Sequence, residues 1–387
     1  MRTAILSDLH LGSGSSIELL DRAEIRDALA PTLVAADRVI LLGDTLELRD
    51  RPLPEVIELA RPAFTWLGEV VGDRDLILVA GNHDHHLVSP WIERRALEGR
   101  DGLGLEQPVE PADGPLAALA EAAGPGRLTA SYPGVWVRPD VYATHGHYLD
   151  RHLTIPTIER LANAAVEKLL GLADEPGAGG PTERSDAVRV TEYERVQTPV
   201  NELLFSLAQG GRDGPGPGTG ASFKVWRTLT GRATRAARLR GLLLSSTALR
   251  GGVGLANRLG LGPVSPDLSP RAITAAGLEA IGDVISRLGI DARHVVFGHT
   301  HRRGPMPGDR GWEAHGTRLW NTGSWVFAPS LIGSGAARSP YWPGTVVVVE
   351  DTGPPELHHL LDGWSGENLR RRSHPTTGGI RTSGHTG

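Results

Sequence analysis

The sequence predicts an α/β protein with a largely buried sheet and a block of helices inserted between two strand-bearing parts of the chain. Three observations predict this fold class. Short apolar runs alternate with segments of helical periodicity over the first 150 residues, as is typical of strands and helices packed in layers. From about residue 150 to 289 the periodicity is helical only, between loops rich in glycine and proline. Apolar runs of strand length return between residues 293 and 350.

The first part of the chain is expected to supply much of the sheet. Its first three apolar runs stop at Asp8, at Gly43 and at Gly81. Short apolar runs that end at such residues are typical of buried strands. Strands are therefore predicted at 3–7, 38–42, 76–80, 135–137 and 141–144, and helices at 17–36 and 54–71.

The middle of the chain is predicted to be an insertion, or cap, on a single α/β domain. Its helices are expected at 154–172, 186–209, 223–245 and 271–288, with Gly/Pro-rich loops at 175–181 and 210–220. Strands are expected again at 293–297, 318–321, 325–328 and 345–350. The expected units are a domain formed by residues 1–150 and 290–362, the insertion 151–289, and a disordered tail 363–387.

The composition excludes several classes of protein. Of the 387 residues, 40% are hydrophobic and 22% charged, which is the mix of a globular chain rather than of a disordered or fibrous one. The sequence has no cysteine, so disulfide frameworks, thiolate metal sites and a cysteine nucleophile are excluded. The formal net charge of −5 gives no global indication of nucleic-acid binding.

The location and source of the protein can be predicted only coarsely. No apolar segment is long enough for a signal peptide or a membrane span, so we expect a cytoplasmic protein, peripheral to a membrane at most. Only Lys168 and Lys224 are lysines, and Arg, Ala, Gly and Pro are abundant. This usage indicates a GC-rich, bacterial genome.

Five polar clusters lie in order along the chain, most of them directly after a predicted strand. The carboxyl ends of strands in an α/β sheet converge on one crevice, so residues far apart in the sequence can meet there. Imidazoles, carboxylates and an amide are the ligands that Mn, Fe, Zn or Ni prefer, rather than Ca. The clusters are Asp8-Leu-His10, Gly43-Asp44, Gly81-Asn82-His83-Asp84, Thr144-His145-Gly146-His147 and Gly298-His299-Thr300-His301.

The spacing within these clusters suits two metal ions. Residues i and i+2 of an extended strand point the same way, so Asp8 and His10 could reach one ion together, and so could His299 and His301. Asp44 could bridge two ions, and the amide of the third cluster could add a neutral oxygen. Seven ligands with one shared bridge are enough for two ions about 3.5–4 Å apart, an arrangement that serves phosphoryl hydrolysis.

In order and content the five clusters resemble the calcineurin-like metallophosphoesterase superfamily. The pattern D-x-H, G-D, G-N-H-D, H-G-H and G-H-x-H covers the chain from Asp8 to His301, with the helical block between the fourth and fifth motifs. Asn321-Thr-Gly-Ser324 resembles the N-x-G-S turn of that family. The resemblance implies a four-layer α/β/β/α sandwich of two mixed sheets. It also implies dinuclear-metal-dependent hydrolysis of a phosphoester or pyrophosphate bond.

The resemblance also implies which residues hold the two divalent ions, for which Mn²⁺ is expected first and Fe, Zn or Ni are alternatives. The fourth motif offers two candidate ligands. His145 is preferred because it directly ends its strand, which leaves His147 outside the ligand set. The implied ligands are Asp8, His10 and His301 for one ion, Asn82, His145 and His299 for the other, and Asp44 as the bridge.

The implied reaction is attack on phosphorus by a water that bridges both ions and loses its proton near neutral pH. His83 would stabilise the charge on the phosphoryl oxygens and donate a proton to the leaving group. Asp84 would hold the His83 ring and favour its charged form. No covalent intermediate is required.

Two features near the third motif bear on the substrate. Glu47 follows Asp44 in the form G-D-x-x-E, which resembles the branch of UDP-2,3-diacylglucosamine pyrophosphohydrolases, where a helical insertion caps the site over acyl chains. The chain departs from that branch, which typically carries Arg where His83 stands, and its insertion is longer. His85 and His86 are either solvated loop histidines or a further imidazole pair near the site.

The insertion carries a basic stretch within residues 222–260. No acidic residue lies between Asp213 and Asp267, and apolar residues such as Trp226 and Leu239 are interleaved with the basic ones. Such a stretch could be a solvated cap helix, could lie on an anionic membrane or guide a phosphorylated lipid, or could contact nucleic-acid phosphates. The basic residues are Lys224, Arg227, Arg232, Arg235, Arg238, Arg240, Arg250 and Arg258.

The predicted function is therefore a metal-dependent phosphoester or pyrophosphate hydrolase whose substrate is a phosphorylated or nucleotide-linked lipid, with small phosphoesters as the rival. A nuclease, a cyclic-nucleotide-type phosphodiesterase and a metal-free scaffold are the alternatives. All seven implied ligands are present, which argues against the scaffold. The candidate substrate-binding residues are His85, His86, His147, Arg235 and Arg238.

Overall fold

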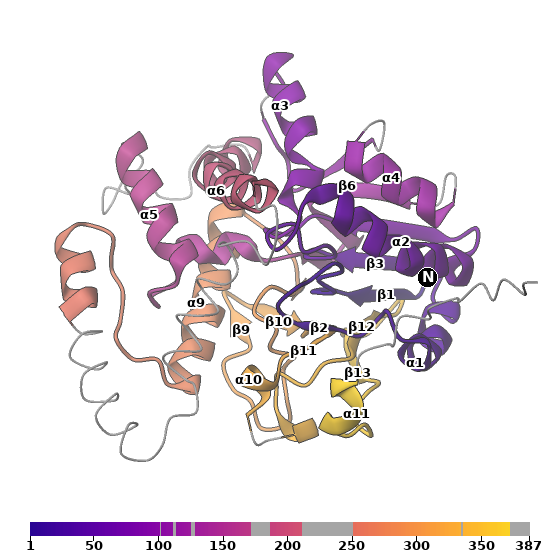
Figure 1. Cartoon of the computed structure of the whole chain (residues 1–387). Helices are drawn as coiled ribbons and strands as arrows, with labels where there is room; N and C mark the ends of the chain where they lie inside the picture. The colour runs from indigo at the N-terminus through magenta and orange to yellow at the C-terminus, as the bar shows by residue number, and fades with distance from the viewer. Residues whose placement is uncertain are drawn as a thin grey trace, which may run out of the picture.

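The computed structural model of the chain is a mixed α/β protein with one long, curled sheet (Figure 1). It describes residues 1–100, 102–110, 114–124, 128–171, 186–210, 251–333 and 336–371. Eleven strands form one sheet, ten of them along a single path of hydrogen-bonded neighbours, and two short strands form a separate pair. The long path, in spatial order, is β13 (Glu356–His359), β12 (Thr345–Val349), β1 (Thr3–Leu6), β3 (Arg38–Leu42), β4 (Asp75–Val79), β6 (Leu128–Arg138), β7 (Val141–Thr144), β8 (His294–Phe297), β10 (Thr317–Asn321) and β9 (Glu313–Ala314), with β5 (Glu106–Val109) beside β6.

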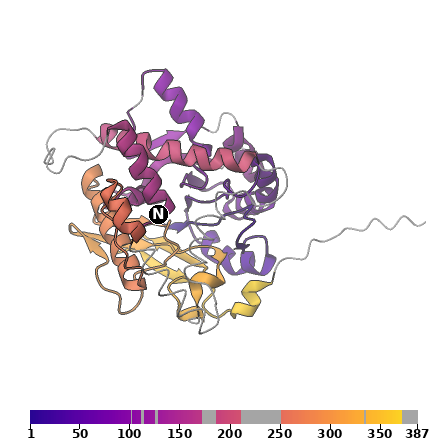
Figure 2. The same ribbon diagram turned by 60° about the vertical axis from the view of Figure 1, so that its left-hand side comes forward.

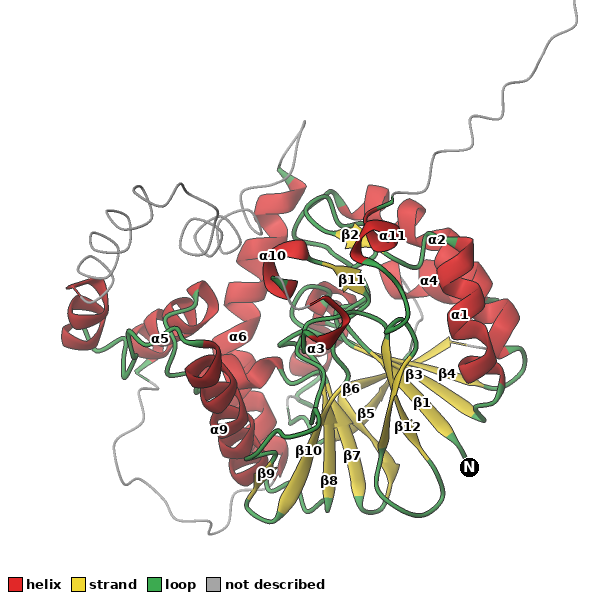
Figure 3. Cartoon of the chain, turned by 90° about the horizontal axis from the view of Figure 1, so that it is seen from below, coloured by secondary structure: helices red, strands yellow, loops and turns green. Residues whose placement is uncertain are grey.

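Strand β6 joins the two halves of this sheet. Its residues 128–131 pair with β4 and its residues 134–138 pair with β7. The strands on either side spread as two fans in Figure 3. Strands β1, β3 and β4 run parallel in one half, and β7, β8 and β10 run parallel in the other. Each half therefore has a set of carboxyl ends on one edge.

The alternation of side chains along the strands divides the core into three clusters. In the first half, Leu6 and Leu78 point toward helices, whereas Ile5 and Val79 belong to a cluster made of strand residues from both halves. In the second half, alternate residues of β7, β8 and β10 point toward a different set of helices. The continuous apolar runs of the sequence follow from this arrangement, because both faces of the strands are covered.

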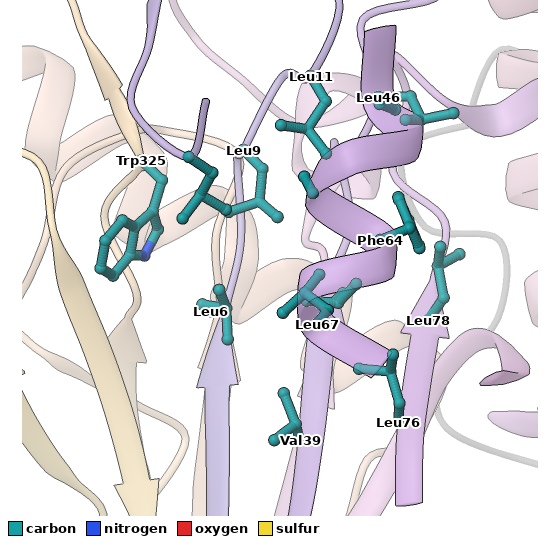
Figure 4. Close-up of a cluster of buried hydrophobic side chains, with 14 of the residues drawn as sticks. Leu6, Leu9, Leu11, Val39, Leu46, Phe64, Leu67, Leu76, Leu78 and Trp325 are labelled. Carbon is teal, nitrogen blue, oxygen red and sulfur yellow. The ribbon is translucent and has the colours of Figure 1, made fainter. Parts of the chain in front are cut away.

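Helices α1 (Ala23–Val34), α2 (Leu53–Val71) and α4 (Gly114–Ala123) cover the first half. The apolar stripe of α2 explains its position, since Val56, Ala60, Phe64 and Leu67 recur at helical spacing and are all buried. Figure 4 shows Phe64 and Leu67 facing the side chains of β3 and β4. The helix ends at Gly72, whose φ of 64° is a backbone conformation that glycine adopts without strain.

The inserted helices lie on the other side of the molecule (Figures 1 and 2). They are α5 (Ile158–Leu170), α6 (Asp186–Gln209) and α9 (Pro270–Leu288), and α9 packs on the second half of the sheet. Helix α6 contacts α5, α9 and η1 (His85–Leu87), which follows β4. No helix in the described ranges combines the length and the apolar character that crossing a bilayer requires. The predicted helix at 223–245 lies outside the described residues.

Most predicted strands and helices are found, with shifted ends, but two expectations differ from the structure. Residues 17–18 form β2 (Ile17–Glu18), paired with β11 (Val326–Phe327), so the helix predicted at 17–36 starts only at Ala23. The tail expected from residue 363 begins with the packed helix α11 (Gly366–Arg370), which buries Leu369. The strands of both halves belong to one hydrogen-bonded sheet, and the two mixed sheets that the resemblance implies stay a prediction. The elements not predicted include α3 (Ser89–Leu97), α4, β5, β9, β13 and α10 (Pro329–Ile332).

Candidate metal centre

The five sequence motifs come together at the carboxyl ends of parallel strands. Asp8, Asp44 and Asn82 follow β1, β3 and β4, while His145 and His299 follow β7 and β8. Backbone hydrogen bonds hold these ends side by side, from Asp8 N to Gly43 O (3.0 Å) and from Gly298 N to His145 O (2.9 Å). The two halves are also joined directly, because His299 N donates to Asp8 Oδ2 (3.1 Å).

The backbone of this edge is strained where the candidate ligands sit. Of the six non-glycine residues with positive φ in the described chain, five are candidate ligands. Such a backbone costs on the order of 1 kcal/mol or more per residue and is retained where the surrounding structure fixes it. The turns therefore aim the side chains at a common point against their local preference. The five residues are Asp8 (φ 54°), His10 (46°), Asp44 (48°), His299 (65°) and His301 (56°).

One group of possible metal ligands consists of Asp8, His10 and His301, whose ligand atoms all lie within 4.8 Å of one another. His301 Nε2 is 3.2 Å from Asp8 Oδ1 and 3.0 Å from His10 Nε2. His10 donates from Nδ1 to Glu47 Oε2 (3.0 Å). In a neutral ring this leaves the lone pair on Nε2, directed at the other two side chains.

A second group consists of Asp44, His145 and His299, again within 4.8 Å. His145 donates from Nδ1 to Leu42 O (2.9 Å), and its Nε2 lies 3.2 Å from Asp44 Oδ2. His299 Nδ1 lies 3.1 Å from Asn82 Oδ1, which adds the amide oxygen to this group. Asp44 Oδ2 is also 3.9 Å from His10 Nε2, so its carboxylate lies between the two groups.

Two buried polar atoms indicate that the groups are suited to a bound cation. Asp8 Oδ1 and His145 Nε2 find no hydrogen-bond partner among the described residues, although both side chains are fully buried. Buried polar atoms without a partner are rare in proteins and call for a ligand or a water. Imidazole nitrogens, carboxylates and one amide oxygen form a donor set that suits divalent transition metals.

The electrostatics of the edge also favour cations. Burial would lower the pKa of His145, but the charge of Asp44 outweighs it and raises that pKa to about 9. At His10, burial would also lower the pKa, but the contacts with Asp8 and Glu47 outweigh it and raise the pKa well above the ordinary value. At Asp44, burial would raise the pKa, yet the neighbouring imidazoles hold it well below the usual range. The carboxylates therefore stay ionised and their field attracts positive charge.

The close approach of these side chains requires glycine at two positions. A Cβ on Gly81 would overlap Asp44 Oδ1 and the ring of His145. A Cβ on Gly298 would overlap the side chains of Ser7 and Asp8. The glycines that begin the third and fifth motifs thus make room for the ligands behind them.

His83 forms a further possible group with His10 and Asp44, whose ligand atoms also lie within 4.8 Å of one another, but its partner differs from the expectation. The sequence assigned Asp84 to hold the His83 ring, whereas the ring donates from Nδ1 to Glu47 (2.8 Å to Oε2 and 2.9 Å to Oε1). The Asp84 carboxylate instead accepts from the backbone nitrogens of Thr45 (2.7 Å) and Gly81 (2.6 Å). Asp84 therefore fixes the backbone of the second and third motifs and does not touch His83.

Sequence reasoning missed the residue that fixes His299. Asp150 Oδ1 accepts from His299 Nε2 (2.9 Å), which leaves Nδ1 of that ring for the second group. Asp150 lies in η2 (His147–Arg151), three residues after the fourth motif. No spacing rule marks it, because its partner is distant in the sequence. The only signal for this residue in the sequence is that an acidic side chain follows shortly after the fourth motif.

The remaining candidates of the third and fourth motifs face the insertion. His85 is 1% exposed and bonds to Glu194 Oε2 (2.9 Å) of α6, so it is not a solvated loop histidine. His86 is stacked on Phe205 of α6, with 3.7 Å between ring centres, and pairs with Glu202. His147 is also 1% exposed, and its ring packs against Tyr148. The structure thus brings His145, and not His147, to Asp44.

Most of the basic stretch predicted within residues 222–260 lies outside the described residues. Arg235 and Arg238, with every basic residue of that stretch except Arg258, lie outside the described residues. Several leucines are exposed on α5, on α6 and in the described segment that begins at residue 251. These are Leu169, Leu170, Leu203, Leu207, Leu255 and Leu259.

Comparison with known proteins adds little to this geometry. No family model matches the chain, and no curated protein does either. The chain is similar to a crystal structure of a dimetal phosphatase from Danio rerio, with 11% identity and a TM-score of 0.32. The similarity covers 92% of this chain and 98% of that protein. An identity and a TM-score this low support no argument about function, so the candidate metal centre is interpreted from the contacts between its residues.

Proposed function

We propose that this protein is a dinuclear-metal-dependent hydrolase of phosphoester or pyrophosphate bonds. The observation that carries the proposal is the pair of buried His/Asp groups that meet at Asp44. Two adjacent cation sites with a shared carboxylate suit a reaction in which charge develops on several oxygens at once. A single group of this kind would suit a structural ion as well as a catalytic one.

In this proposal the chain divides its ligands between two ions. Bound divalent ions would supply Lewis acidity toward phosphoryl oxygens and activation of a water nucleophile. Manganese is the ion we expect first, with iron, zinc or nickel as alternatives. The proposed ligands are Asp8, His10 and His301 for the first ion, Asn82, His145 and His299 for the second, and Asp44 for both.

His83 is the proposed proton donor to the leaving oxygen. Its side chain is 18% exposed, whereas that of His10 is 5% exposed, so its ring can reach a substrate at the rim. Its Nδ1 is bonded to Glu47, which leaves Nε2 for the substrate. An imidazole at that position can stabilise a phosphoryl oxygen or donate a proton.

We also propose the finer architecture that the resemblance implies, a sandwich of two mixed sheets with helices outside. It is supported by the cluster of strand residues that contains Ile5, Ile40, Val141 and Val296 from both halves. Helix α2 with its neighbours and helix α9 bury two separate clusters of apolar side chains. Strand β6 would then be the connection between the two sheets.

The substrate class we favour is a phosphorylated or nucleotide-linked lipid. Support comes from the exposed leucines of the inserted helices and from the acid-free basic stretch that the sequence places between them. Both would suit an amphiphile with an anionic head. A nuclease needs the same positive charge, and salt-sensitive binding of DNA would favour it instead.

The test compares hydrolysis of bis-p-nitrophenyl phosphate and p-nitrophenyl phosphate by the metal-stripped protein before and after Mn²⁺ is added. We expect turnover only with the metal, and the preferred compound identifies a diesterase or a monoesterase. His299→Ala should abolish turnover. His315→Ala is the matched control, because His315 also has a left-handed backbone but is exposed and lies outside the two groups.

Equal metal-dependent turnover in the two variants would refute the assignment of His299. If neither compound is hydrolysed, the same comparison is repeated with a phosphorylated lipid in mixed micelles. Failure there, with bound metal verified by elemental analysis, would refute the proposed hydrolase.

A further inference from the structure

Arg49 is a buried cation between the inserted helices and the candidate metal centre. Its side chain is 3% exposed, and an arginine keeps its positive charge inside a protein. A buried charge is stable only where polar or oppositely charged atoms surround it. Oxygen atoms from three separate segments of the chain meet this guanidinium.

The three oxygens belong to different elements. Arg49 Nη2 donates to the backbone oxygen of Asn82 in the third motif and to Asn201 Oδ1 of α6, at 2.8 Å each. Nη1 lies 3.8 Å from Oε1 of Glu159, in the first turn of α5. Arg49 itself lies in the loop that follows the second motif. One side chain therefore connects α5 and α6 to the loops of two motifs.

The contact with Asn82 fixes a peptide group inside the candidate metal centre. The oxygen of the peptide between Asn82 and His83 accepts from Arg49, and its nitrogen donates to Asp44 Oδ1 (2.8 Å). A rotation of this peptide would break both hydrogen bonds. Asn82 Oδ1 lies 3.1 Å from His299 Nδ1, so the peptide sets the place of the amide in the second group.

The other partner of Arg49 lies on the buried face of α6. Glu194, Gln197 and Asn201 follow one another at helical spacing and are all buried. Glu194 bonds to His85 (2.9 Å), and Gln197 Nε2 donates to the backbone oxygen of His147 (3.0 Å). Asn201 is therefore held by a helix that is itself fixed at two further points.

We propose that Arg49 and Asn201 are positioning residues that couple the docking of helix α6 to the affinity of the second metal ion. The connection runs from Asn201 through the guanidinium to the peptide after Asn82. The inference rests on the proposed function only for the assignment of Asn82 as a ligand. By linkage, binding of the ion and docking of the helix strengthen each other by the same factor. Neither positioning residue is itself a ligand.

The test measures Zn²⁺ affinity by competition with a chelating dye in a His301→Ala background, where the first group is incomplete. Arg49→Met removes the donor to Asn82 O, and Asn201→Leu removes the acceptor on α6. Each change should weaken zinc binding by roughly 10–100-fold, the usual effect of removing a partner of a metal ligand. In a His299→Ala background, where the second group is incomplete, Arg49→Met should change the affinity by less than about threefold.

The double variant separates a coupled path from two independent structural losses. If Asn201 acts through Arg49, the Arg49→Met/Asn201→Leu protein should bind zinc about as weakly as the weaker single variant. Independent losses would instead multiply. Gln209→Leu is the matched control, because this amide of α6 bonds to Leu53 N (2.9 Å), outside the five motifs. It should leave the zinc affinity within about threefold.

A second readout needs no variant. Zn²⁺ binding to the unaltered full-length protein should slow hydrogen exchange in α6 around Asn201. Unchanged exchange there would overturn the proposal, and so would losses that multiply in the double variant. Full coupling in a protein that binds zinc but hydrolyses no phosphoester would overturn the proposed function alone. A protein that binds no zinc would overturn both.

Discussion

Three imidazoles of the candidate metal centre are each fixed by an acceptor behind the ring, a backbone oxygen in one case and a carboxylate in two. His145 donates to a backbone oxygen, His299 to Asp150, and His10 to Glu47. In every case the bonded nitrogen faces away from the group, so the other nitrogen is left for a cation. The site is therefore set by contacts behind the ligands as much as by the ligands.

Metal binding should strengthen as the pH rises from about 6 toward 9. A ligating imidazole must be neutral, whereas Asp44 raises the pKa of His145 to about 9 in the metal-free protein. A metal ion must therefore displace a proton over this range. Isothermal titration of Mn²⁺ near pH 7, in two buffers of different ionisation enthalpy, should show net proton release.

The stability of the metal-free protein should change in the opposite direction. The raised native pKa of His145 adds stability that is complete below its unfolded pKa of about 6.5 and is lost as the pH rises through about 9. The prediction for metal binding would be contradicted by an Mn²⁺ affinity that stays constant between about pH 6 and 9 without proton release.

At this scale the sequence predicted which side chains meet but not what holds them. The motif order sufficed for Asp8, Asp44 and His299, because strand ends converge. It assigned Asp84 to the His83 ring, although that carboxylate is taken by backbone nitrogens. The correct partner could not be predicted, because it depends on how two loops pair and not on neighbours in the sequence.

Helix α6 joins the insertion to the candidate site through a buried polar network. Glu194 accepts from His85 (2.9 Å), from Tyr132 (2.6 Å) and from Tyr148. Arg49 donates both to Asn201 Oδ1 of the helix and to the backbone oxygen of Asn82 (2.8 Å each). The helix therefore supports the third motif directly.

Replacing Glu194 by alanine should lower the free energy of unfolding by about 3–5 kcal/mol, because the change leaves His85 and two tyrosine hydroxyls buried without their acceptor. Arg195→Ala, on the exposed side of the same helix, should change it by less than about 0.5 kcal/mol. Urea titration of both variants measures the difference.

The effect of Glu194 should also depend on pH. Burial would lower the pKa of His85, but Glu194 raises it to about 9, and His85 in turn lowers the pKa of Glu194 from 4.5 to about 2. The stabilisation is therefore full between about pH 4.5 and 6.5, and it is lost as the pH rises through about 9 or falls toward about 2. Equal midpoints for the two variants at neutral pH would show that the network contributes nothing.

Helix α2 was predicted from its apolar stripe, whereas the shorter elements α3 and β5 were missed. The stripe of α2 predicted its range to within one residue at its start. The sequence of α3 and the polar strand β5 carry no such pattern, since they lie at the edge of the fold with many exposed positions. Their structure depends on neighbours such as β6 rather than on their own periodicity.

In the whole molecule, the candidate centre lies where the two halves of the sheet meet. Asp8 and Asp44 come from the first half, and His145, His299 and His301 from the second. The strands of the two halves share an apolar cluster but are connected along the sheet only through β6 in the described chain. Bound ions would strengthen the edge where His299 N already donates to Asp8 Oδ2 between the two halves.

Metal binding should therefore stabilise both halves together. At a free Mn²⁺ concentration of about 100 times the dissociation constant, the gain for one ion is about 2.7 kcal/mol, seen as a higher Tm that EDTA reverses. Hydrogen exchange should slow in β3 and in β8 alike, because opening either half would release the ion. Asp44→Asn, which removes the shared carboxylate charge, should abolish the Tm shift and the added protection in both strands. Protection confined to one half, or a full shift in Asp44→Asn, would mean that the ions bind elsewhere or to one half only, and the bridging position of Asp44 would then be wrong.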